Sequence, residues 1–218
     1  MSSSLVGSEM CIRDSNVYIW GDFDGTKDFD PDSNSVFNLT AVGTYGDPAL
    51  LKLDSAWNFV WARTLVDFSA RDIALDNQGN LVMTGFFSGT RDFDPGPGTF
   101  FLTTATSSAS YISKLDGDWS FLNAWMVSDG TGTYGAGITN SLAVSSSNEI
   151  LVTGNYSDST DFDPSPGTDI HYSFGGSNDA FVQKWDGAGN LQWTVSYGRN
   201  QSEIGYEIDV DAGGNVYV

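Results

Sequence analysis

The sequence predicts an all-β fold, a partial β-propeller with about three four-stranded antiparallel blades and the start of a fourth. Three observations predict it. The motif Asp-Phe-Asp-Pro occurs three times, short β-prone runs alternate with turn residues, and no long segment has apolar residues at helical spacing. Self-similarity at a near-constant period indicates a repeat architecture, in which each unit is covered by its neighbours.

The repeated motif lies at 28–31, 92–95 and 161–164. A similar frame precedes each copy, at 20–26, 84–90 and 153–159. We therefore expect one truncated repeat domain, 16–218, with these approximate repeats: 16–69, 70–137, 138–202 and 203–218.

The β-prone runs follow the same order in each repeat. The first repeat has them at 17–19, 50–54 and 59–64. The second repeat has them at 73–75, 81–87, 100–102, 111–116 and 121–127. The third repeat has them at 142–144, 150–152, 180–186 and 191–195, and a fourth repeat begins at 208–210. Short turns such as 76–80, rich in Asp, Asn and Gly, separate these runs. Four principal strands per repeat are typical of a propeller blade, whose two apolar faces pack on neighbouring blades.

Three tryptophans, Trp61, Trp125 and Trp193, recur near the last of these runs. We expect them to pack between blades, because a buried indole removes a large apolar area from water. Extra residues between Phe121 and Trp125 predict a bulge in the second repeat.

The first fifteen residues match no part of the repeat. They resemble the translation of a transposase-based sequencing adapter, which encodes Leu5 through Asp14 and begins Ser15. We interpret 1–15 as an artefact, with a natural disordered N-terminus as the alternative, and leave it out of the fold prediction. The end of the chain, 215–218, repeats 16–19 and then stops, so we expect a fragment of a longer reading frame. A targeting signal, if there was one, is then missing from this chain.

The composition excludes several function classes. There are 28 acidic and 9 basic side chains, a net charge of −19, and no basic footprint for a nucleic acid. No segment has the length and apolarity of a membrane span. The single cysteine, Cys11, lies in the suspected artefact, which excludes disulfides and thiol catalysis in the repeat domain. Cations, carbohydrates and protein surfaces remain as partners, together with the remaining blades of the full-length protein.

The acidic motif is the candidate metal site. Its carboxylates stand at alternate positions, as in calcium-binding loops. The candidate ligands are Asp28, Asp30, Asp92, Asp94, Asp161 and Asp163. An EF-hand is rejected, because the twelfth position is Leu39, Thr103 or Tyr172 rather than an acid. Two interpretations remain open: Ca²⁺ in another geometry, or aspartates that only form turns while the central Phe fills the edge of the blade.

No catalytic or cofactor-binding residues are assigned; the residues favour a non-enzymatic chain and leave a glycosidase that uses two carboxylates open. The one histidine, His171, has no recognisable nucleophile or second ligand beside it in sequence, which favours an ordinary edge or loop histidine. Asp76, Asp186 and Asp211 precede glycine-containing turns and are interpreted as turn residues. Recurrence of a lysine in one strand of each repeat favours a structural role; these are Lys52, Lys114 and Lys184.

The repeat also resembles a known family. The run Asn-Val-Tyr-Val at 215–218, the Thr-Gly pairs, and 178–193 with Asn-Asp-Ala-Phe-Val-Gln-Lys-Trp-Asp-Gly-Ala-Gly-Asn-Leu-Gln-Trp resemble the bacterial β-propeller repeat called SBBP. The resemblance covers nearly all of 16–218. It implies a β-propeller in a secreted or cell-surface protein and implies no particular activity.

Together these observations give a leading hypothesis. The chain is a non-catalytic propeller scaffold of a secreted or cell-surface bacterial protein, with loops for adhesion or for binding carbohydrate or protein, and with calcium as a candidate stabiliser. The alternative is the substrate-binding propeller of an extracellular hydrolase or lyase.

Overall fold

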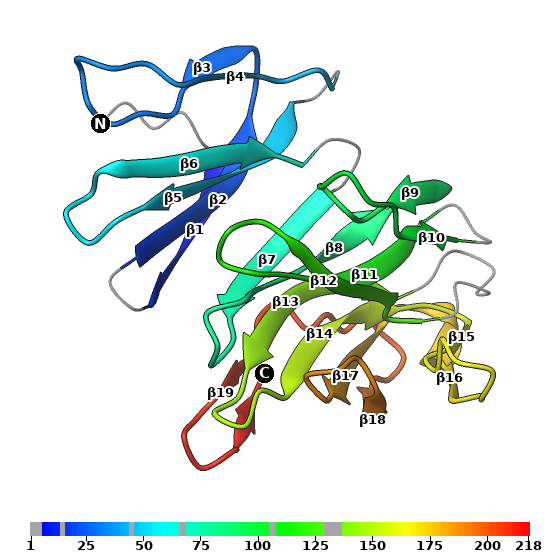
Figure 1. Cartoon of the computed structure of the whole chain (residues 1–218). Coiled ribbons are helices and arrows are strands. Elements are labelled where there is room, and N and C mark those ends of the chain that lie inside the picture. The colour runs from blue at the N-terminus through cyan, green and yellow to red at the C-terminus, as the bar shows by residue number, and fades with distance from the viewer. Residues whose placement is uncertain (1–5, 14–15, 44–45, 66–68, 105–107, 129–136) are drawn as a thin grey trace. The chain divides into compact units, whose positions relative to one another are not determined.

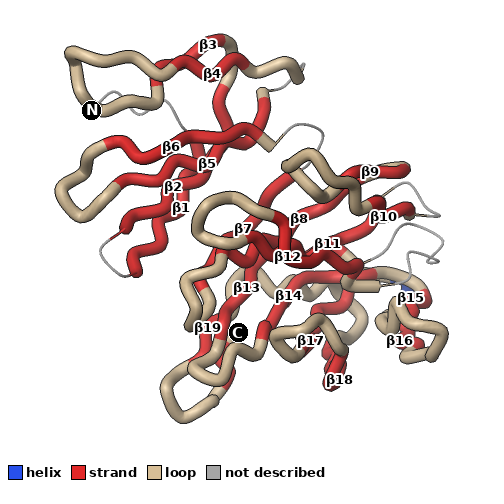
Figure 2. The backbone as a smooth tube through the Cα atoms, viewed as in Figure 1, coloured by secondary structure: helices blue, strands red, loops and turns tan. Residues whose placement is uncertain are grey.

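The computed structural model describes residues 6–13, 16–43, 46–65, 69–104, 108–128 and 137–218, with 6–13 described by its backbone alone. The chain forms two compact units, Met1–Ala70 and Arg71–Val218. Strands dominate, and the helical element in the described ranges is one short 3₁₀ turn, η1 (Phe174–Gly176) (Figure 2). The all-β prediction is confirmed. Within the same ranges no helix is long and apolar enough to cross a membrane.

The first unit contains sheet I, an antiparallel sheet of four strands in the order β1-β2-β5-β6 (Figure 1). Its strands are β1 (Val6–Arg13), β2 (Asn16–Phe23), β5 (Asp47–Leu53) and β6 (Phe59–Thr64). A two-stranded ribbon, β3 (Thr26–Asp28) with β4 (Asn38–Thr40), lies between β2 and β5 in sequence.

Strand β1 comes from the segment interpreted as adapter-derived. It pairs antiparallel with β2, from Arg13 opposite Asn16 to Val6 opposite Asp22. Pairing at a sheet edge uses main-chain groups and needs no particular side chains. The strand therefore does not bear on the origin of this segment, which stays a prediction. Residues 1–5 and 14–15 lie outside the described ranges.

The second unit is built around two more four-stranded antiparallel sheets. Sheet II has the order β12-β11-β8-β7, with β7 (Ser69–Leu75), β8 (Leu81–Phe87), β11 (Ala109–Leu115) and β12 (Phe121–Met126). Sheet III has the order β13-β14-β17-β18, with β13 (Ile138–Val144), β14 (Ile150–Tyr156), β17 (Asp179–Trp185) and β18 (Leu191–Tyr197). The ribbons are β9 (Thr90–Asp92) with β10 (Phe101–Thr103), β15 (Ser159–Asp161) with β16 (Ile170–Tyr172), and β19 (Asp209–Val210) with β20 (Val216–Tyr217).

The middle strands are buried on both faces, which explains their nearly continuous apolar sequence. All seven residues of β11 are buried, and β8, β14 and β17 each have six buried residues out of seven. The edge strand β18, in contrast, has no buried residue. Burial therefore separates the middle strands from the outer strand of sheet III, although all of them are rich in β-prone residues.

The main core of the second unit lies between sheets II and III. It contains Val82, Ile112, Trp125 and Val127 from sheet II, and from sheet III Leu142, Ile150, Val152, Phe181 and Trp185. Polar groups are paired across the same boundary: the buried carboxylate of Asp72 accepts hydrogen bonds from the hydroxyl of Ser141 and the backbone N–H of Leu142, both at 2.7 Å.

The other face of sheet III is covered in part by the last ribbon, β19–β20 (Figure 1). Ala143, Leu151 and Val182 form a second cluster there with Ile208, and Val210 and Val216 pack against it. Sheet III is therefore packed on both faces near its first three strands.

The prediction that Trp61, Trp125 and Trp193 all pack between blades is wrong for Trp193. Trp61 pairs with Lys52 and Trp193 pairs with Lys184, but Trp125 pairs with Ile112, two residues further along the strand. Asn123 is the residue that faces the corresponding Lys114. Trp125, 8% exposed, is buried between sheets II and III, whereas Trp193 is 38% exposed.

The bulge predicted for the second repeat is present, but it is not special to that repeat. The register shifts by one residue between Lys114 and Leu115, and the same shift follows Lys52 and Lys184. Each shift lies beside the hairpin turn, where an extra residue is accommodated by local twist.

Candidate functional site

The first aspartate of each Asp-Phe-Asp-Pro motif accepts hydrogen bonds from both sides of its loop. In the second copy, Asp92 Oδ1 accepts hydrogen bonds from the backbone N–H of Asp94 at 3.1 Å and of Phe100 at 2.8 Å. The other two copies make the same pair of bonds: Asp28 with Asp30 and Phe37, and Asp161 with Asp163 and Asp169. This aspartate therefore acts as a turn residue in every copy.

The second aspartate caps the next turn. Asp94 Oδ1 accepts from the backbone N–H of Gly96 at 2.8 Å, two residues further on. The corresponding bonds are Asp30 with Asp32 and Asp163 with Ser165, both at 2.9 Å. In the second and third copies, a glycine lets the backbone come close to this aspartate. A Cβ at Gly98 would collide with Oδ2 of Asp94, and a Cβ at Gly167 would collide with Oδ2 of Asp163.

The central phenylalanine anchors each loop to the core. Phe29, Phe93 and Phe162 are 3%, 5% and 0% exposed. Each ring packs edge to face against the ring of the last aromatic residue in an earlier strand. The partners are Phe23, Phe87 and Tyr156, at centroid distances of 5.1, 5.3 and 5.2 Å. The aspartates on either side are exposed or half-buried, so the motif has the arrangement that the turn interpretation predicts.

The six candidate metal ligands thus each have one carboxylate oxygen engaged with backbone amides. Across the described ranges, no group of three or more His, Cys, Asp or Glu side chains gathers closely enough to hold a metal ion. Calcium prefers six to eight oxygen ligands, and main-chain carbonyls or waters would have to supply the rest. Calcium binding at these loops stays a prediction from the sequence.

The other aspartates singled out in the sequence are hairpin turn residues, as predicted. Asp186 Oδ1 accepts from the backbone N–H of Ala188 and Asn190, and its Oδ2 accepts from the Asn190 side chain at 2.7 Å. Asp76 and Asp211 bind their own turns in the same way. These hydrogen bonds, first of all from the Asn190 side chain, hold the pKa of Asp186 below its ordinary value.

The recurrent lysines have structural partners, as predicted. Lys114 forms an ion pair of 2.7 Å with Asp76, whose side chain is 1% exposed. Burial raises the pKa of Asp76, but hydrogen bonds from Lys114 and Asn80 outweigh it and leave the pKa below its usual range. Lys184 pairs with Glu149 at 2.7 Å. Each bond ties the third strand of a sheet to the turn between its first two strands.

His171 lies in the edge ribbon, on β16, as an ordinary structural histidine would. The fold nevertheless places a second partner beside it, in addition to Asp169, that the sequence did not reveal. Its Nδ1 is 2.7 Å from the hydroxyl of Ser196 on β18, and its Nε2 is 3.2 Å from Oδ1 of Asp169. The ring also meets Phe162 edge to face at 5.4 Å. These contacts join the ribbon to the outer strand of sheet III.

A pocket of about 610 Å³ lies next to this junction. One wall is the third Asp-Phe-Asp-Pro loop, with Asp163, Pro164, Ser165, Thr168 and Asp169; the other is the turn and start of β18, with Trp185, Gly189, Asn190, Leu191, Gln192, Trp193 and Thr194. We call it the loop pocket. It combines an exposed indole, two carboxylates and two side-chain amides, and its lining contains no lysine or arginine.

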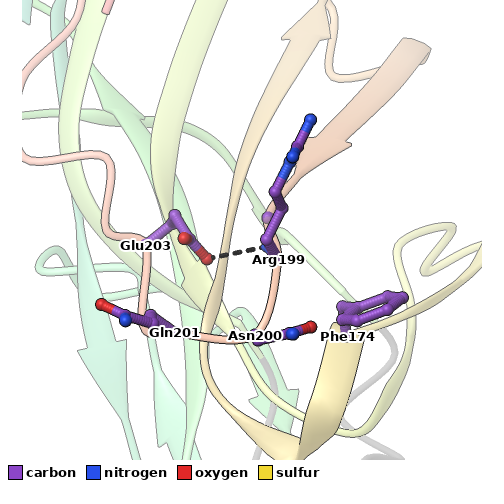
Figure 3. Close-up of a pocket in the computed structure, with 6 residues that line it drawn as sticks. Phe174, Arg199, Asn200, Gln201 and Glu203 are labelled. Carbon is purple, nitrogen blue, oxygen red and sulfur yellow. Dashed lines mark hydrogen bonds between the residues drawn. The ribbon is translucent and has the colours of Figure 1, made fainter.

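A second pocket, of about 720 Å³, follows β18 (Figure 3). Its lining consists of Phe174, Gly198, Arg199, Asn200, Gln201 and Glu203. The carboxylate of Glu203 accepts a hydrogen bond from the backbone N–H of Arg199 at 3.1 Å, while the Arg199 side chain extends away from the loop (Figure 3). The carboxylate is therefore used to shape the loop, and Phe174, 59% exposed, is its one large apolar surface.

No protein-family model matches the chain, and no curated protein matches it. The resemblance to the SBBP repeat accordingly remains a sequence-based prediction.

Proposed function

We propose that the chain is a non-catalytic β-propeller scaffold of a secreted or cell-surface bacterial protein, which presents its loops for binding. The secreted or surface location rests on the SBBP resemblance alone. The propeller rests on one structural observation: two of the contacts between sheets II and III recur at equivalent positions between sheet III and the start of the fourth repeat.

The inner strands carry the first matching contacts. Asp72 and Ser141 are equivalent residues of successive repeats. Asp72 precedes the turn residue Asp76 by the same number of residues as Ser141 precedes the turn residue Ser145. Leu142 donates its N–H to Asp72, and Ile208 donates its N–H to the hydroxyl of Ser141 at 3.2 Å. Leu142 and Ile208 each lie three residues before the next turn residue. The backbone N–H of an equivalent residue in consecutive first strands therefore donates to an equivalent position of the preceding first strand.

The second strands make a further matching contact. The Thr84 hydroxyl accepts or donates a hydrogen bond with the Thr139 hydroxyl of the next sheet at 2.7 Å. At Thr153, the equivalent of Thr84, the chain of the fourth repeat approaches so closely that a Cβ at Gly205 would collide with the hydroxyl. Stacking of sheets by one repeated operation is what generates a propeller or a solenoid.

The outer strands differ in how far their apolar side chains are covered by the next repeat. Trp125 and Val127 of the second repeat are 8% and 0% exposed, because sheet III covers them. Val195 and Tyr197 take the same positions relative to Lys184 that Trp125 and Val127 take relative to Lys114. They are 53% and 43% exposed. The proposed scaffold thus has an apolar stripe that a further repeat of this type would cover.

The exposed stripe can be tested by self-association. We expect the average mass, measured by sedimentation velocity, to rise with protein concentration. The double substitution Val195→Asp with Tyr197→Ser should lower that average mass. Association should increase with salt, because copies with a net charge of −19 repel one another at low ionic strength.

Two matched substitutions serve as controls. Val36→Asp and Tyr172→Ser remove the same kinds of side chain at sites that are more exposed, 68% and 74%. If general surface hydrophobicity causes the association, the control substitutions should lower the average mass more than the stripe substitutions do. If the stripe stacks on another copy, the stripe substitutions should lower the average mass more. A chain that is monomeric at every concentration, or controls that act as strongly as the stripe variants, would overturn the proposal.

A further inference from the structure

We propose that the loop pocket binds a neutral oligosaccharide. This inference rests on the proposed function in one respect, that the scaffold binds ligands through its loops. It adds the location of the site and the chemical class of the ligand.

The size and lining of the pocket fit a small sugar. A volume of about 610 Å³ lies within the roughly 300–1,000 Å³ of ligand sites in proteins. Such sites combine apolar or aromatic surface with a few convergent polar groups. Trp193, 38% exposed, supplies the aromatic surface, and a pyranose ring has an apolar C–H face that can lie against an indole.

The polar lining favours hydroxyl groups as partners. Carboxylates of Asp163 and Asp169 can accept hydrogen bonds, and the amides of Asn190 and Gln192 can both donate and accept. Sugar hydroxyls do both as well, so they match this mixed set. Because the lining has two carboxylates and no lysine or arginine, an anionic ligand would be repelled, which excludes acidic sugars and phosphates.

Both walls are held in place before a ligand arrives. On one wall, Asp163 Oδ1 accepts from the N–H of Ser165, and the N–H of Asp169 donates to Asp161 at 2.7 Å. The side chain of Asp169 is oriented by His171. A wall that is already ordered loses less conformational entropy on binding, so more of the contact energy contributes to affinity.

The opposite wall is fixed by the hairpin turn. Asn190 is bound by Asp186 through both its backbone N–H and its side chain. Gln192 donates to the carbonyl of Asn190 at 3.2 Å, and the Thr194 hydroxyl lies 3.3 Å from the side-chain amide of Gln183. The same turn chemistry that closes the hairpin therefore also positions the polar groups of the pocket.

The test is isothermal titration of the whole chain with five neutral tetrasaccharides: maltotetraose, cellotetraose, mannotetraose, xylotetraose and chitotetraose. We expect at least one to bind, and Trp193→Ala to weaken that binding at least about tenfold, as removal of a central aromatic contact does elsewhere. Gln192→Ala should weaken it by a smaller factor, which gives a second variant at an exposed site with little effect on folding.

Trp57→Ala is the matched control, because Trp57 is another exposed tryptophan, at 45%, in a hairpin turn of the first unit. It should leave sugar affinity unchanged. Absence of binding to all five sugars, or equal loss in both tryptophan variants, overturns the inference. So does preferential binding of trilysine, which would show a site for cationic side chains. Release of new reducing ends from a bound sugar would show catalysis and would support the hydrolase alternative.

Failure of this test leaves the scaffold proposal standing, since self-association through Val195 and Tyr197 is measured separately. The two assays also use different substitutions. A loss of self-association and a loss of sugar binding can therefore be assigned to separate surfaces.

Discussion

Trp125 of sheet II packs against Trp185 of sheet III, with ring centroids 6.0 Å apart and ring planes at 44°. Gly189 makes this approach possible. A Cβ at Gly189 would lie 2.9 Å from Cε3 of Trp125, and its φ of +91° is in the region that glycine adopts without strain. The pair is the aromatic centre of the core between the two sheets.

Replacing Trp125 by Ala should lower the free energy of unfolding by about 3–5 kcal/mol, because it leaves a large cavity between two sheets. Urea denaturation measures the change. Trp193→Ala is the control, and we expect a shift within about 0.5 kcal/mol, as at other surface sites. Equal losses in the two variants would contradict the assignment of Trp125 to the inter-sheet core.

Gly154→Ala tests the close approach of two strands within sheet III. A Cβ at Gly154 would overlap the carbonyl oxygen of Ile138 on β13, and backbone cannot rotate away as a side chain can. We expect a loss of about 1–3 kcal/mol in the free energy of unfolding. At Gly213 an added Cβ would meet only side-chain atoms of Asp211 and Asn215, no nearer than 3.2 Å. Gly213→Ala should be nearly neutral, and a similar cost there would argue against the strand contact as the cause.

Acid should destabilise the fold through its turn aspartates. Hydrogen bonds from the following turn, chiefly from Asn58, Asn190 and Asn215, lower the pKa of Asp54, Asp186 and Asp211. A lowered folded-state pKa means that the stabilisation is complete above the ordinary value of 3.8 and is lost as pH falls through the folded-state pKa. We expect the urea midpoint to be flat from pH 7 to about pH 5 and to fall below about pH 4. Asp186→Asn should flatten that fall; an unaltered acid limb would contradict the argument.

The Asp-Phe-Asp-Pro loops can be tested at Asp92. Asp92→Ala removes the acceptor of two backbone N–H groups, and we expect a loss of about 1–3 kcal/mol in unfolding free energy. Asp92→Asn keeps an oxygen acceptor at the same place and should cost less. The exposed Asp118 gives a control in Asp118→Ala. If the Asn and Ala variants of Asp92 lose the same amount, charge rather than hydrogen bonding is the important property.

Calcium binding at the same loops has its own test. If Ca²⁺ is bound by these aspartates, EDTA should lower the melting temperature and added CaCl₂ should restore it, because a ligand of the folded state raises its stability. Asp94→Asn should weaken the response. An identical melting curve in EDTA and in CaCl₂ would reject calcium as a stabiliser and leave turn formation as the role of the motif.

The sequence predicted the strands well where they are buried or end at a clear turn. The ranges 81–87 and 59–64 coincide with β8 and β6, because apolar β-prone residues there run between turn residues with little ambiguity. The ribbon strands β3, β4, β9, β15 and β16 were missed. Each has only three residues, and their pairing depends on Phe29, Phe93 and Phe162 being anchored in the core.

The candidate site was less predictable. Sequence alone placed Asp169 beside His171 but gave no signal for Ser196, which lies 25 residues away and reaches the ring from a different strand. Trp193 is not a packing residue like Trp125, although both follow the same one-residue register shift at their hairpins. Trp125 pairs with Ile112, two residues beyond Asn123, which holds the position of Trp193, so one tryptophan lies in the core and the other at the loop pocket.

By itself the sequence determined the local structure of this protein: the repeat, the turns and the all-β class. These follow from side chains that bond to their own backbone within a few residues and from runs that suit extended chain. The tertiary structure decided which aromatic side chains are buried, which polar groups meet around the loop pocket, and which stripe stays exposed. Those outcomes depend on contacts between residues tens of positions apart, whose register is fixed only when the sheets pack against one another.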